Sequence, residues 1–368
     1  MAVKAKAEVN KFWDLRRKAA AEQAGRRQRV DTSEQAAAQI FGAARTAGIN
    51  FDQYDAIKVV RSGLSPDTHV PELESFGMLT NPDWLCNNIK RMGYEKPTPI
   101  QRHAIPVAIH GFDIMCCAQT GSGKTAAFLT PIACSLGTTA SSRKKFKASD
   151  PAQPLALVLA PTRELASQIH NEALKLCFGS HNRAVCVYGG ASANKQLEDL
   201  ARGVEILVAT PGRLTDFVDR SVVTLASCKF LVLDEADRML DMGFEPQIRR
   251  IVQQRDLPPR ESRSTFMFSA TFAREIQKLA AEFMREFVWI AVGRVGSSAD
   301  SITQRVWRLE SPGKPERLRL CIKALNSVAG RTLIFVQTKR NARWVARQIS
   351  RMCQEGDVEG CHSVVCRG

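Results

Sequence analysis

The chain has 368 residues, enough for two domains, and its 44% hydrophobic and 24% charged residues are typical of a globular protein. An excess of 52 basic over 37 acidic residues gives a net charge of +15, which favours nucleic acid as a partner over a membrane, although a basic surface can also serve solubility alone. No apolar run is long enough to cross a bilayer, Met1 is not followed by the apolar core of a secretory signal, and the 11 cysteines show no disulfide framework, so we expect an intracellular protein with no membrane partner.

Residues 1–48 are rich in alanine and basic side chains. The first 30 residues contain nine basic and three acidic residues, a net charge of +6. This composition predicts a disordered arm, partly helical at most, that contacts RNA without sequence specificity. A mitochondrial presequence is the alternative, and Glu8, Asp14 and Glu22 argue against it because such peptides avoid acidic residues.

From residue 114 onward, strand-like and helix-like patterns alternate. The apolar strand-like runs are 114–118, 155–160, 184–188, 205–209, 230–234, 264–269 and 288–292, and helical patterns include 164–178 and 274–284. This alternation predicts an α/β fold with a parallel sheet covered by helices on both faces, interrupted by an exposed basic loop at 141–154. Ligands of such sheets bind beyond the carboxyl ends of the strands.

The segment AQTGSGKT, Ala118 to Thr125, follows a predicted strand and opens a predicted helix. It fits the phosphate-binding pattern G-x-x-x-x-G-K-[ST] when the first glycine is relaxed to alanine. Glycines allow backbone N–H groups to surround phosphate oxygens, Lys124 can reach the β- and γ-phosphates, and the Thr125 hydroxyl can ligate Mg²⁺. A chance glycine-rich turn is the alternative. The predicted nucleotide-binding residues are Ala118, Gln119, Thr120, Gly121, Ser122, Gly123, Lys124 and Thr125.

Three carboxylates arrive at the end of another predicted strand, in Asp234-Glu235-Ala236-Asp237. Taken alone, acidic residues there are typical of a turn that caps the next helix. A phosphate-binding loop, however, needs an acid on another strand to hold the metal through water. We therefore predict that Asp234 holds Mg²⁺ and that Glu235 orients or deprotonates the attacking water, while capping can still explain Asp237.

A second αβ series follows a glycine- and serine-rich stretch at 293–301 that is typical of a linker. Its predicted elements are a strand at 302–309, a helix at 315–327, a strand at 332–337 and a helix at 341–353. Cys353, Cys361, His362 and Cys366 match no familiar zinc-site spacing and give only a weak hypothesis of a metal site.

In their order along the chain, these motifs resemble those of a DEAD-box RNA helicase. GYEKPTPIQ, with Phe76 seventeen residues before Gly93, resembles the Q motif. The resemblance implies that Phe76 and Tyr94 form an adenine platform and that Gln101 hydrogen-bonds the base edge. PTRELA, Gly189-Gly190, TPGRL and LIFVQTKR resemble RNA-backbone motifs, implying RNA contacts at Thr162, Arg163, Gly190, Thr210, Arg213, Thr338 and Lys339. SAT resembles the motif in which the hydroxyls of Ser269 and Thr271 bond Asp237 and couple the nucleotide state to RNA binding.

The same resemblance implies a domain organisation and an activity. We expect a basic arm at 1–48, a pre-helicase segment at 49–103 with the Q motif at 74–102, an ATP-binding RecA-like domain at 104–292, a linker at 293–301 and a partial second RecA-like lobe at 302–368. The implied activity is that of an ATP- and Mg²⁺-dependent RNA helicase with Lys124, Asp234 and Glu235 as catalytic residues, acting as a monomer on single-stranded or duplex RNA.

Segments such as INFDQYDAI, FEPQIRRIV and VGRVGSSADSITQ resemble the Vasa/Belle branch of the family. That branch implies roles in mRNA translation or metabolism, contacts with translation-initiation or messenger-ribonucleoprotein proteins, and a cytoplasmic location with possible nuclear shuttling. The arm lacks the arginine-glycine repeats expected of this branch.

Two motifs of the family's second lobe, ARGxD and HRIGRTGR, do not occur in the sequence. Because such second-lobe arginines stabilise charge on the γ-phosphate, we expect this 368-residue chain to hydrolyse ATP poorly. A helicase fragment, a non-unwinding short form that binds nucleotide and RNA, and an unrelated P-loop ATPase acting on protein or DNA remain open. The Q motif with Phe76 argues against the last.

Overall fold

The computed structural model describes residues 2–25, 32–42, 57–65, 68–79, 82–138, 147–293, 303–309, 313–327 and 330–355. The chain divides into two compact units, Met1–Ser297 and Ser298–Gly368, each considered by itself. Several segments with predictions lie outside the described residues. They are residues 49–56, nearly all of the expected linker at 293–301, and Cys361, His362 and Cys366.

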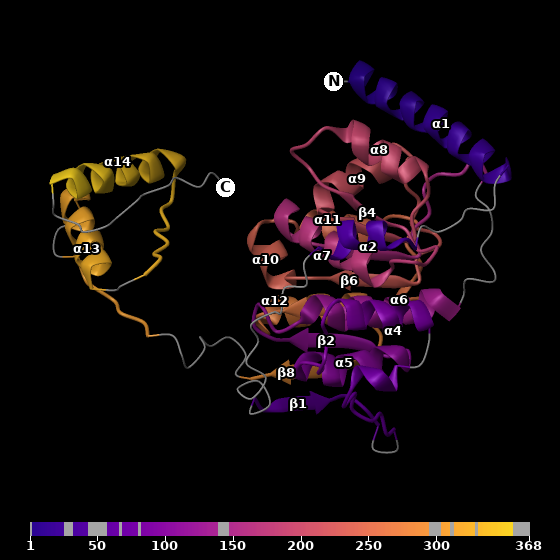
Figure 1. The fold of residues 1–368 in the computed structure, drawn as a ribbon, viewed down its shortest axis with the longest axis horizontal. Coiled ribbons are helices and arrows are strands. Elements are labelled where there is room, and N and C mark those ends of the chain that lie inside the picture. Colours follow the sequence, from indigo (N-terminus) through magenta and orange to yellow (C-terminus); the bar gives the residue numbers. More distant parts are fainter. Residues whose placement is uncertain are drawn as a thin grey trace. The chain divides into compact units, whose positions relative to one another are not determined.

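The first unit contains an eight-stranded sheet in the order β1-β8-β2-β7-β6-β3-β5-β4 (Figure 1). Only β1 is antiparallel to its neighbour, β8, and the other pairs of this sheet are parallel. The strands are β1 Val59–Ser62, β2 Asp113–Cys117, β3 Ala156–Leu159, β4 Ala184–Val187, β5 Ile206–Ala209, β6 Phe230–Leu233, β7 Ser264–Ser269 and β8 Phe287–Val292. Each apolar run predicted as a strand of this sheet is a strand, so the α/β prediction is confirmed.

Helices cover both faces of the sheet, because successive strand residues point to opposite sides. Ile114 and Cys116 of β2 join a core with buried residues of α4 Asp83–Arg91, α5 Pro99–Ile109, α6 Lys124–Thr138 and α7 Arg163–Leu176. Met115 and Cys117 join the opposite core, which includes residues of α8 Ala193–Ala201, α9 Pro211–Asp219, α10 Ala236–Asp241, α11 Glu245–Gln253 and α12 Arg274–Phe283. The two cores hold the carboxyl ends of the parallel strands in one rigid edge.

The prediction of a disordered arm is wrong for most of residues 1–48, which form α1 Ala2–Gly25 and α2 Glu34–Phe41. Helix α1 packs on α8, with Phe12 fully buried in the second core (Figure 1). The Arg16 guanidinium is also buried and donates to the carbonyls of Asp150, Ala201 and Pro151. The prediction from composition failed because two residues on the same helical face, Phe12 and Arg16 with its aliphatic stem, are enough to anchor a helix that is otherwise polar.

The basic loop at 141–154 was expected to be exposed, and its described part is not exposed throughout. Ala152 is fully buried and forms a parallel β-bridge with Val223. Its N–H donates to the carbonyl of Val222, and Thr224 returns a hydrogen bond to its carbonyl. The end of the loop therefore belongs to the core, because its backbone groups find partners there.

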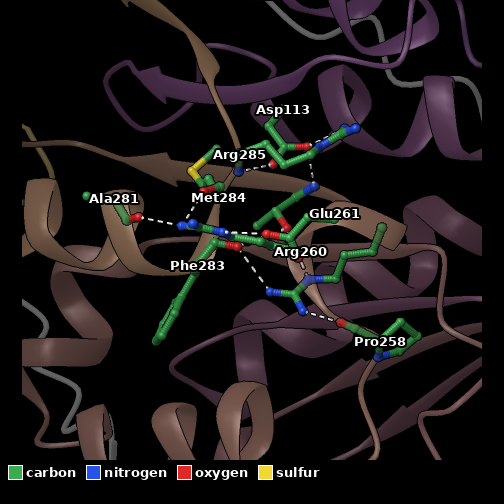
Figure 2. A network of polar contacts seen from close by, with 10 residues as sticks. Asp113, Pro258, Arg260, Glu261, Ala281, Phe283, Met284 and Arg285 are labelled. Carbon is green, nitrogen blue, oxygen red and sulfur yellow. Dashed lines mark hydrogen bonds and ion pairs between the residues drawn. The ribbon is translucent and has the colours of Figure 1, made fainter.

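A buried polar network lies at the amino ends of β2 and β7, the edge of the sheet opposite to the carboxyl ends (Figure 2). The fully buried Asp113 carboxylate accepts hydrogen bonds from the backbone N–H of Thr265 and Arg285 and from the Arg285 guanidinium. Arg260 donates to the carbonyls of Ala281 and Met284 and Arg263 to that of Phe283, so arginines satisfy the carbonyls at the end of α12. The network ties α12 and β8 to the rest of the sheet.

The second unit contains α13 Lys314–Asn326 and α14 Lys339–Glu355. The two helices predicted there are confirmed within a few residues. The predicted strands at 302–309 and 332–337 are wrong for their described parts, since 303–309 and 332–337 form no strand. An apolar run becomes a strand only when another strand pairs with its backbone. None of the helices in the described residues combines the length and apolarity needed to cross a membrane.

Candidate nucleotide and RNA site

The motif residues of the first unit gather at the carboxyl ends of the parallel strands. The loop 118–123 follows β2, Thr162 follows β3, and Gly189-Gly190 follows β4. Thr210 follows β5, Asp234 follows β6, and Ser269 ends β7. Because neighbouring parallel strands end at the same edge, motifs more than 150 residues apart in sequence become neighbours in space.

The loop after β2 has the backbone of a phosphate cradle. Gly121 and Gly123 adopt φ of 81° and 88°, values that side-chain-bearing residues rarely adopt. Helix α6 begins at Lys124, so its free N–H groups and positive dipole end face the loop. The buried Lys124 ammonium donates to the Ala118 carbonyl at 3.0 Å and lies across the loop. This arrangement fits a chain of phosphates.

The Q motif contacts the phosphate loop directly. The Gln101 Nε2 donates to the Gly123 carbonyl at 3.1 Å, and its Oε1 accepts from the Thr98 N–H at 3.0 Å. The Thr98 hydroxyl donates to the Ser122 carbonyl at 2.8 Å. The sequence did not predict this contact of the Q motif with the phosphate loop, and the base-edge contact of Gln101 stays a prediction. The Gln101 side-chain amide keeps one further N–H on its Nε2 and one further lone pair on its Oε1 for a base.

Phe76 and Tyr94 form a stacked aromatic pair, with ring centroids 5.9 Å apart and planes at 28°. Phe76 is buried, and Tyr94 donates its hydroxyl to Glu172 at 3.2 Å. Burial and the neighbouring Glu172 raise the pKa of the Tyr94 hydroxyl, so this side chain stays neutral. The two rings lie together, as an adenine platform requires, and their contact with a base stays a prediction.

The Asp234 carboxylate is buried and raised in pKa. Burial is the main cause of a pKa near 6, the Lys124 ammonium opposes the shift, and Glu235 adds to it. The carboxylate accepts a hydrogen bond from the Glu235 N–H at 3.0 Å. Ionising a buried carboxylate is costly, and a bound cation offsets that cost. Asp234 is therefore suited to holding a cation.

Glu235 occupies a left-handed backbone conformation, with φ 49° and ψ 51°. Non-glycine residues are rarely held there, and such conformations cluster at functional sites. Its carboxylate forms an ion pair with Arg238 at 3.2 Å, while its side chain remains 16% exposed. The left-handed backbone at Glu235 is therefore consistent with a functional role for this residue.

Asp237 connects this segment to the end of β7, although not through the predicted groups. The Asp237 Oδ2 accepts from the backbone N–H groups of Ala270 and Thr271, at 3.1 and 3.0 Å. The fully buried Ser269 accepts from the Thr271 N–H through its hydroxyl. The predicted hydroxyl contacts are therefore corrected to backbone N–H donors, which a carboxylate prefers because two of them can converge on one oxygen.

The donor set suits Mg²⁺. Protein sites for this ion supply one or two carboxylates and leave the remaining positions to water and substrate phosphates. Asp234 offers the carboxylate and Thr125, in the first turn of α6, offers a hydroxyl. A cage of three or more acidic, histidine or cysteine side chains does not occur among the described residues, so the ion would depend on the phosphates for its other ligands.

The predicted RNA residues lie along the same edge. Thr162 caps α7 by accepting from the Leu165 N–H, and the Arg163 guanidinium lies 5.0 Å from the Tyr188 ring centroid. Gly190 has φ 77° with no atom within 4 Å of where a Cβ would stand. The Thr210 hydroxyl accepts from the Gly189 N–H at 3.4 Å, which joins the two loops.

Arg213 is held in place by the neighbouring loop. Its Nη2 donates to the Ala191 carbonyl at 3.1 Å, and its guanidinium lies 5.3 Å from the Phe217 ring centroid. The Nη1 of Arg213 is buried and has no hydrogen-bond partner among the described residues. A buried guanidinium N–H without a partner is rare in folded proteins and marks this side chain as incompletely satisfied.

Thr338 and Lys339 belong to the second unit, at the start of α14. The Thr338 hydroxyl accepts from the Asn341 N–H at 3.1 Å, as an N-terminal cap does. Their RNA contacts stay predictions.

The sequence missed two features of this site. The capping box of Thr98 and Gln101 could have been predicted, because a threonine followed by glutamine three residues later is typical of a helix start, but its contact with Ser122 and Gly123 could not. The second feature is that residues of α1 line a cavity together with Arg213, and it had no signal in the sequence.

Comparison with known proteins agrees with this geometry. A family model described as DEAD/DEAH box helicase matches residues 98–279. The crystal structure of the RNA helicase Prp28 from Chaetomium thermophilum bound to ADP is 35% identical, with a TM-score of 0.54 over 82% of this chain and 68% of that chain. The yeast DEAD-box splicing factor Prp28 is 32% identical, with a TM-score of 0.59 over 82% and 67%. A DEAD box protein from the hyperthermophile Methanococcus jannaschii is 30% identical, with a TM-score of 0.52 over 76% and 71%.

Proposed function

Because the chain belongs to the DEAD/DEAH box helicase family, a family of ATP-hydrolysing RNA helicases, we propose that one edge of its sheet joins an ATP–Mg²⁺ site to an RNA-backbone site. The observation that carries the proposal is the convergence of six motif segments at the carboxyl ends of β2 to β7. The segments after β2 and β6 suit phosphate and metal binding, those after β3, β4 and β5 suit a nucleic-acid backbone, and the end of β7 connects to Asp237.

At the nucleotide end, the loop from Ala118 to Thr125 surrounds the phosphates, Lys124 pairs with the β- and γ-phosphates, and Thr125 and Asp234 hold the Mg²⁺. When bound, the ion neutralises the phosphate charge. Glu235 accepts the proton of the attacking water, and Phe76, Tyr94 and Gln101 select adenine. Support comes from the raised pKa of Asp234 and from the orphan backbone donors at the start of α6.

At the RNA end, Thr162, Arg163, Gly190, Thr210 and Arg213 bind the sugar-phosphate backbone without reading bases. The contact of Asp237 with the backbone of Ala270 and Thr271 couples the nucleotide segment to the end of β7. Thr338 and Lys339 add contacts from the second unit. The chain would bind and remodel RNA or RNA–protein complexes as a monomer.

We also propose the finer assignments suggested by sequence resemblance. The chain would act in mRNA translation or metabolism in the cytoplasm, as members of the Vasa/Belle branch do, with translation-initiation or messenger-ribonucleoprotein proteins as partners. The domain boundaries at 48/49, 103/104 and 292/293 are proposals of the same kind. Support for them is the match of several segments to that branch.

Binding of a fluorescently labelled single-stranded RNA to the full chain tests the proposal. Arg163→Ala and Arg213→Ala should each weaken binding by about five- to thirty-fold, since a lost phosphate contact costs on the order of 1–2 kcal/mol. Arg274→Ala, at the start of α12, is the control of equal charge and should bind as the wild type does. Equal loss in all three variants would show that only net charge matters and would contradict a defined RNA site.

A further inference from the structure

The hydroxyl of Tyr94 is a polar group that an adenine platform does not itself require. A base stacks on the face of an aromatic ring, so a phenylalanine would offer the same surface, as Phe76 does beside it. The Tyr94 hydroxyl instead donates to the Glu172 Oε2 at 3.2 Å, across 78 residues of sequence. Glu172 belongs to none of the helicase motifs described above, and its contact with the platform therefore needs an explanation of its own.

The end of α4 fixes the backbone of Tyr94. Gly93 adopts φ of 71°, a left-handed conformation that commonly ends a helix. Its N–H donates to the Lys90 carbonyl at 3.0 Å. The Tyr94 N–H reaches back to the Ile89 carbonyl at 3.2 Å. These two bonds fold the chain onto the last turn of α4, so Tyr94 leaves that helix in a defined direction.

A second contact docks α4 on the carboxyl end of α7. The Asn88 side chain is buried, and its Nδ2 donates to the Leu176 carbonyl at 3.0 Å and to the Phe178 carbonyl at 2.7 Å. Both N–H groups of this amide are therefore used. Glu172 lies four residues before Leu176, about one turn earlier on α7. The same end of α7 thus holds both the helix that precedes Tyr94 and the Tyr94 hydroxyl.

The two oxygens of the Glu172 carboxylate have different partners. Oε1 pairs with the Lys175 ammonium at 3.4 Å, and Oε2 accepts from Tyr94. Because burial raises the pKa of the Tyr94 hydroxyl, this group keeps its proton and can donate at neutral pH. A hydrogen bond to a charged acceptor is stronger than one between neutral groups. The half-buried Glu172 is therefore a firm anchor for the hydroxyl.

From these contacts we infer that Glu172 is a positioning residue for the nucleotide, which holds the Tyr94 ring in the orientation in which adenine stacks on it. The inference rests on the proposed ATP function. Glu172 does not touch the nucleotide and acts through the Tyr94 hydroxyl alone. The phosphate loop is held by other contacts, those of Thr98 and Gln101. Loss of Glu172 should therefore weaken the binding of the base and leave the binding of the phosphates unchanged.

The test compares, by calorimetric titration with Mg²⁺, the affinities of the full chain for ATP and for inorganic tripolyphosphate, which carries phosphates but no base. Glu172→Ala should weaken ATP binding about five-fold, which corresponds to about 1 kcal/mol, the net contribution of one hydrogen bond. It should leave tripolyphosphate binding unchanged. Removing a negative charge would by itself tighten the binding of an anion, so charge alone does not produce this loss. Glu172→Gln keeps an acceptor for the hydroxyl and should restore the affinity for ATP.

Glu164→Ala, on the exposed surface of the same helix, is the control of equal charge and should change neither affinity. Tyr94→Phe keeps the ring and removes the hydroxyl, so it should match Glu172→Ala, and the double variant should lose no more than either single one. Unchanged ATP affinity in Glu172→Ala, equal weakening of both ligands, or additive losses in the double variant would overturn the inference. If the wild type binds neither ATP nor tripolyphosphate, the proposed function itself fails.

Discussion

Two glycines of the phosphate loop share a backbone conformation but differ in their surroundings. A Cβ at Gly123 would stand 2.5 Å from the Gln101 Nε2 and 2.9 Å from the Thr98 hydroxyl, whereas a Cβ at Gly121 meets nothing within 4 Å. We predict that Gly121→Ala lowers the free energy of unfolding only by the cost of holding alanine at a positive φ, about 1–2 kcal/mol. Gly123→Ala should lower the free energy of unfolding by more. It should also weaken ATP binding at least ten-fold by displacing the Q motif. Chemical denaturation and ATP titration would check both values.

If the two variants were equally stable and bound ATP equally well, the contact between the Q motif and the loop would have no energetic role.

His170 illustrates how burial sets a pH dependence. Its Nε2 lies 3.1 Å from the Ala184 carbonyl, and burial lowers the pKa of the imidazole. A histidine with a lowered folded pKa binds fewer protons in the native state than in the unfolded state. We therefore predict that the free energy of unfolding falls as the pH drops below about 6.5, the unfolded value.

Unfolding by urea at pH 7 and pH 5 would measure this loss. His170→Gln, which can still donate to Ala184, should lose less stability over the same interval than the wild type. An identical pH dependence in both proteins would show that His170 is not its source.

At the scale of elements, the anchoring of α1 depends on one buried side chain. Burial lowers the pKa of the Arg16 guanidinium to about 10, an effect that Asp150 partly offsets, so it stays charged at neutral pH. Arg16→Ala would leave the carbonyls of Asp150, Pro151 and Ala201 without this donor. We expect α1 to lose about 2 kcal/mol of docking stability, the range for hydrogen bonds from a charged group.

Hydrogen exchange of the amides in α1 would detect the change as faster exchange confined to that helix. Arg17→Ala, which removes an exposed neighbour of the same charge, should leave exchange unaltered.

The network at the opposite edge of the sheet joins several elements through one carboxylate. Asp113 is fully buried and meets Arg285 (Figure 2). It also accepts a hydrogen bond from the backbone N–H of Thr265. Removing the carboxylate leaves the buried backbone N–H of Thr265 without its acceptor, at a cost of about 1–3 kcal/mol, while the half-exposed Arg285 can turn to water. Asp113→Ala should thus lower the midpoint of urea unfolding strongly.

Glu261→Ala, which removes an exposed acid paired with Arg260, should shift the midpoint little. Comparable shifts in both variants would mean that burial of Asp113 does not determine its contribution.

The sequence predicted an element correctly where the segments that pack or pair with it could also be inferred. The strands of the sheet are apolar runs buried on both faces, so their pattern alone predicts them, and the glycines and acids that follow them indicate the site. Helix α1 was missed because its docking depends on the shape of α8, which no local pattern encodes. The expected strands at 302–309 and 332–337 failed for the opposite reason, since an apolar run does not reveal whether a partner strand exists. The backbone donors to Asp237 were also invisible, because a sequence shows side chains rather than free N–H groups.

At the scale of the whole molecule, the residues that stabilise the first unit and the residues of its candidate site lie at opposite edges of the sheet. Asp113 and the arginines around it secure the amino ends of the strands, while Glu235 with its left-handed backbone and Asp234 with its raised pKa lie at the carboxyl ends. The net charge of +15 is consistent with a polyanionic partner along that second edge. The account therefore depends on the carboxyl edge being a nucleotide site.

Calorimetric titration of the full chain with ATP, in the presence and absence of Mg²⁺, tests this claim most directly. The wild type should bind ATP more tightly with Mg²⁺. Lys124→Ala should lose at least ten-fold in affinity, because a buried ammonium no longer meets the phosphates, and Asp234→Asn should bind ATP but lose the benefit of Mg²⁺. Affinity equal to that of the wild type in Lys124→Ala, in a protein shown to be folded, would contradict the account.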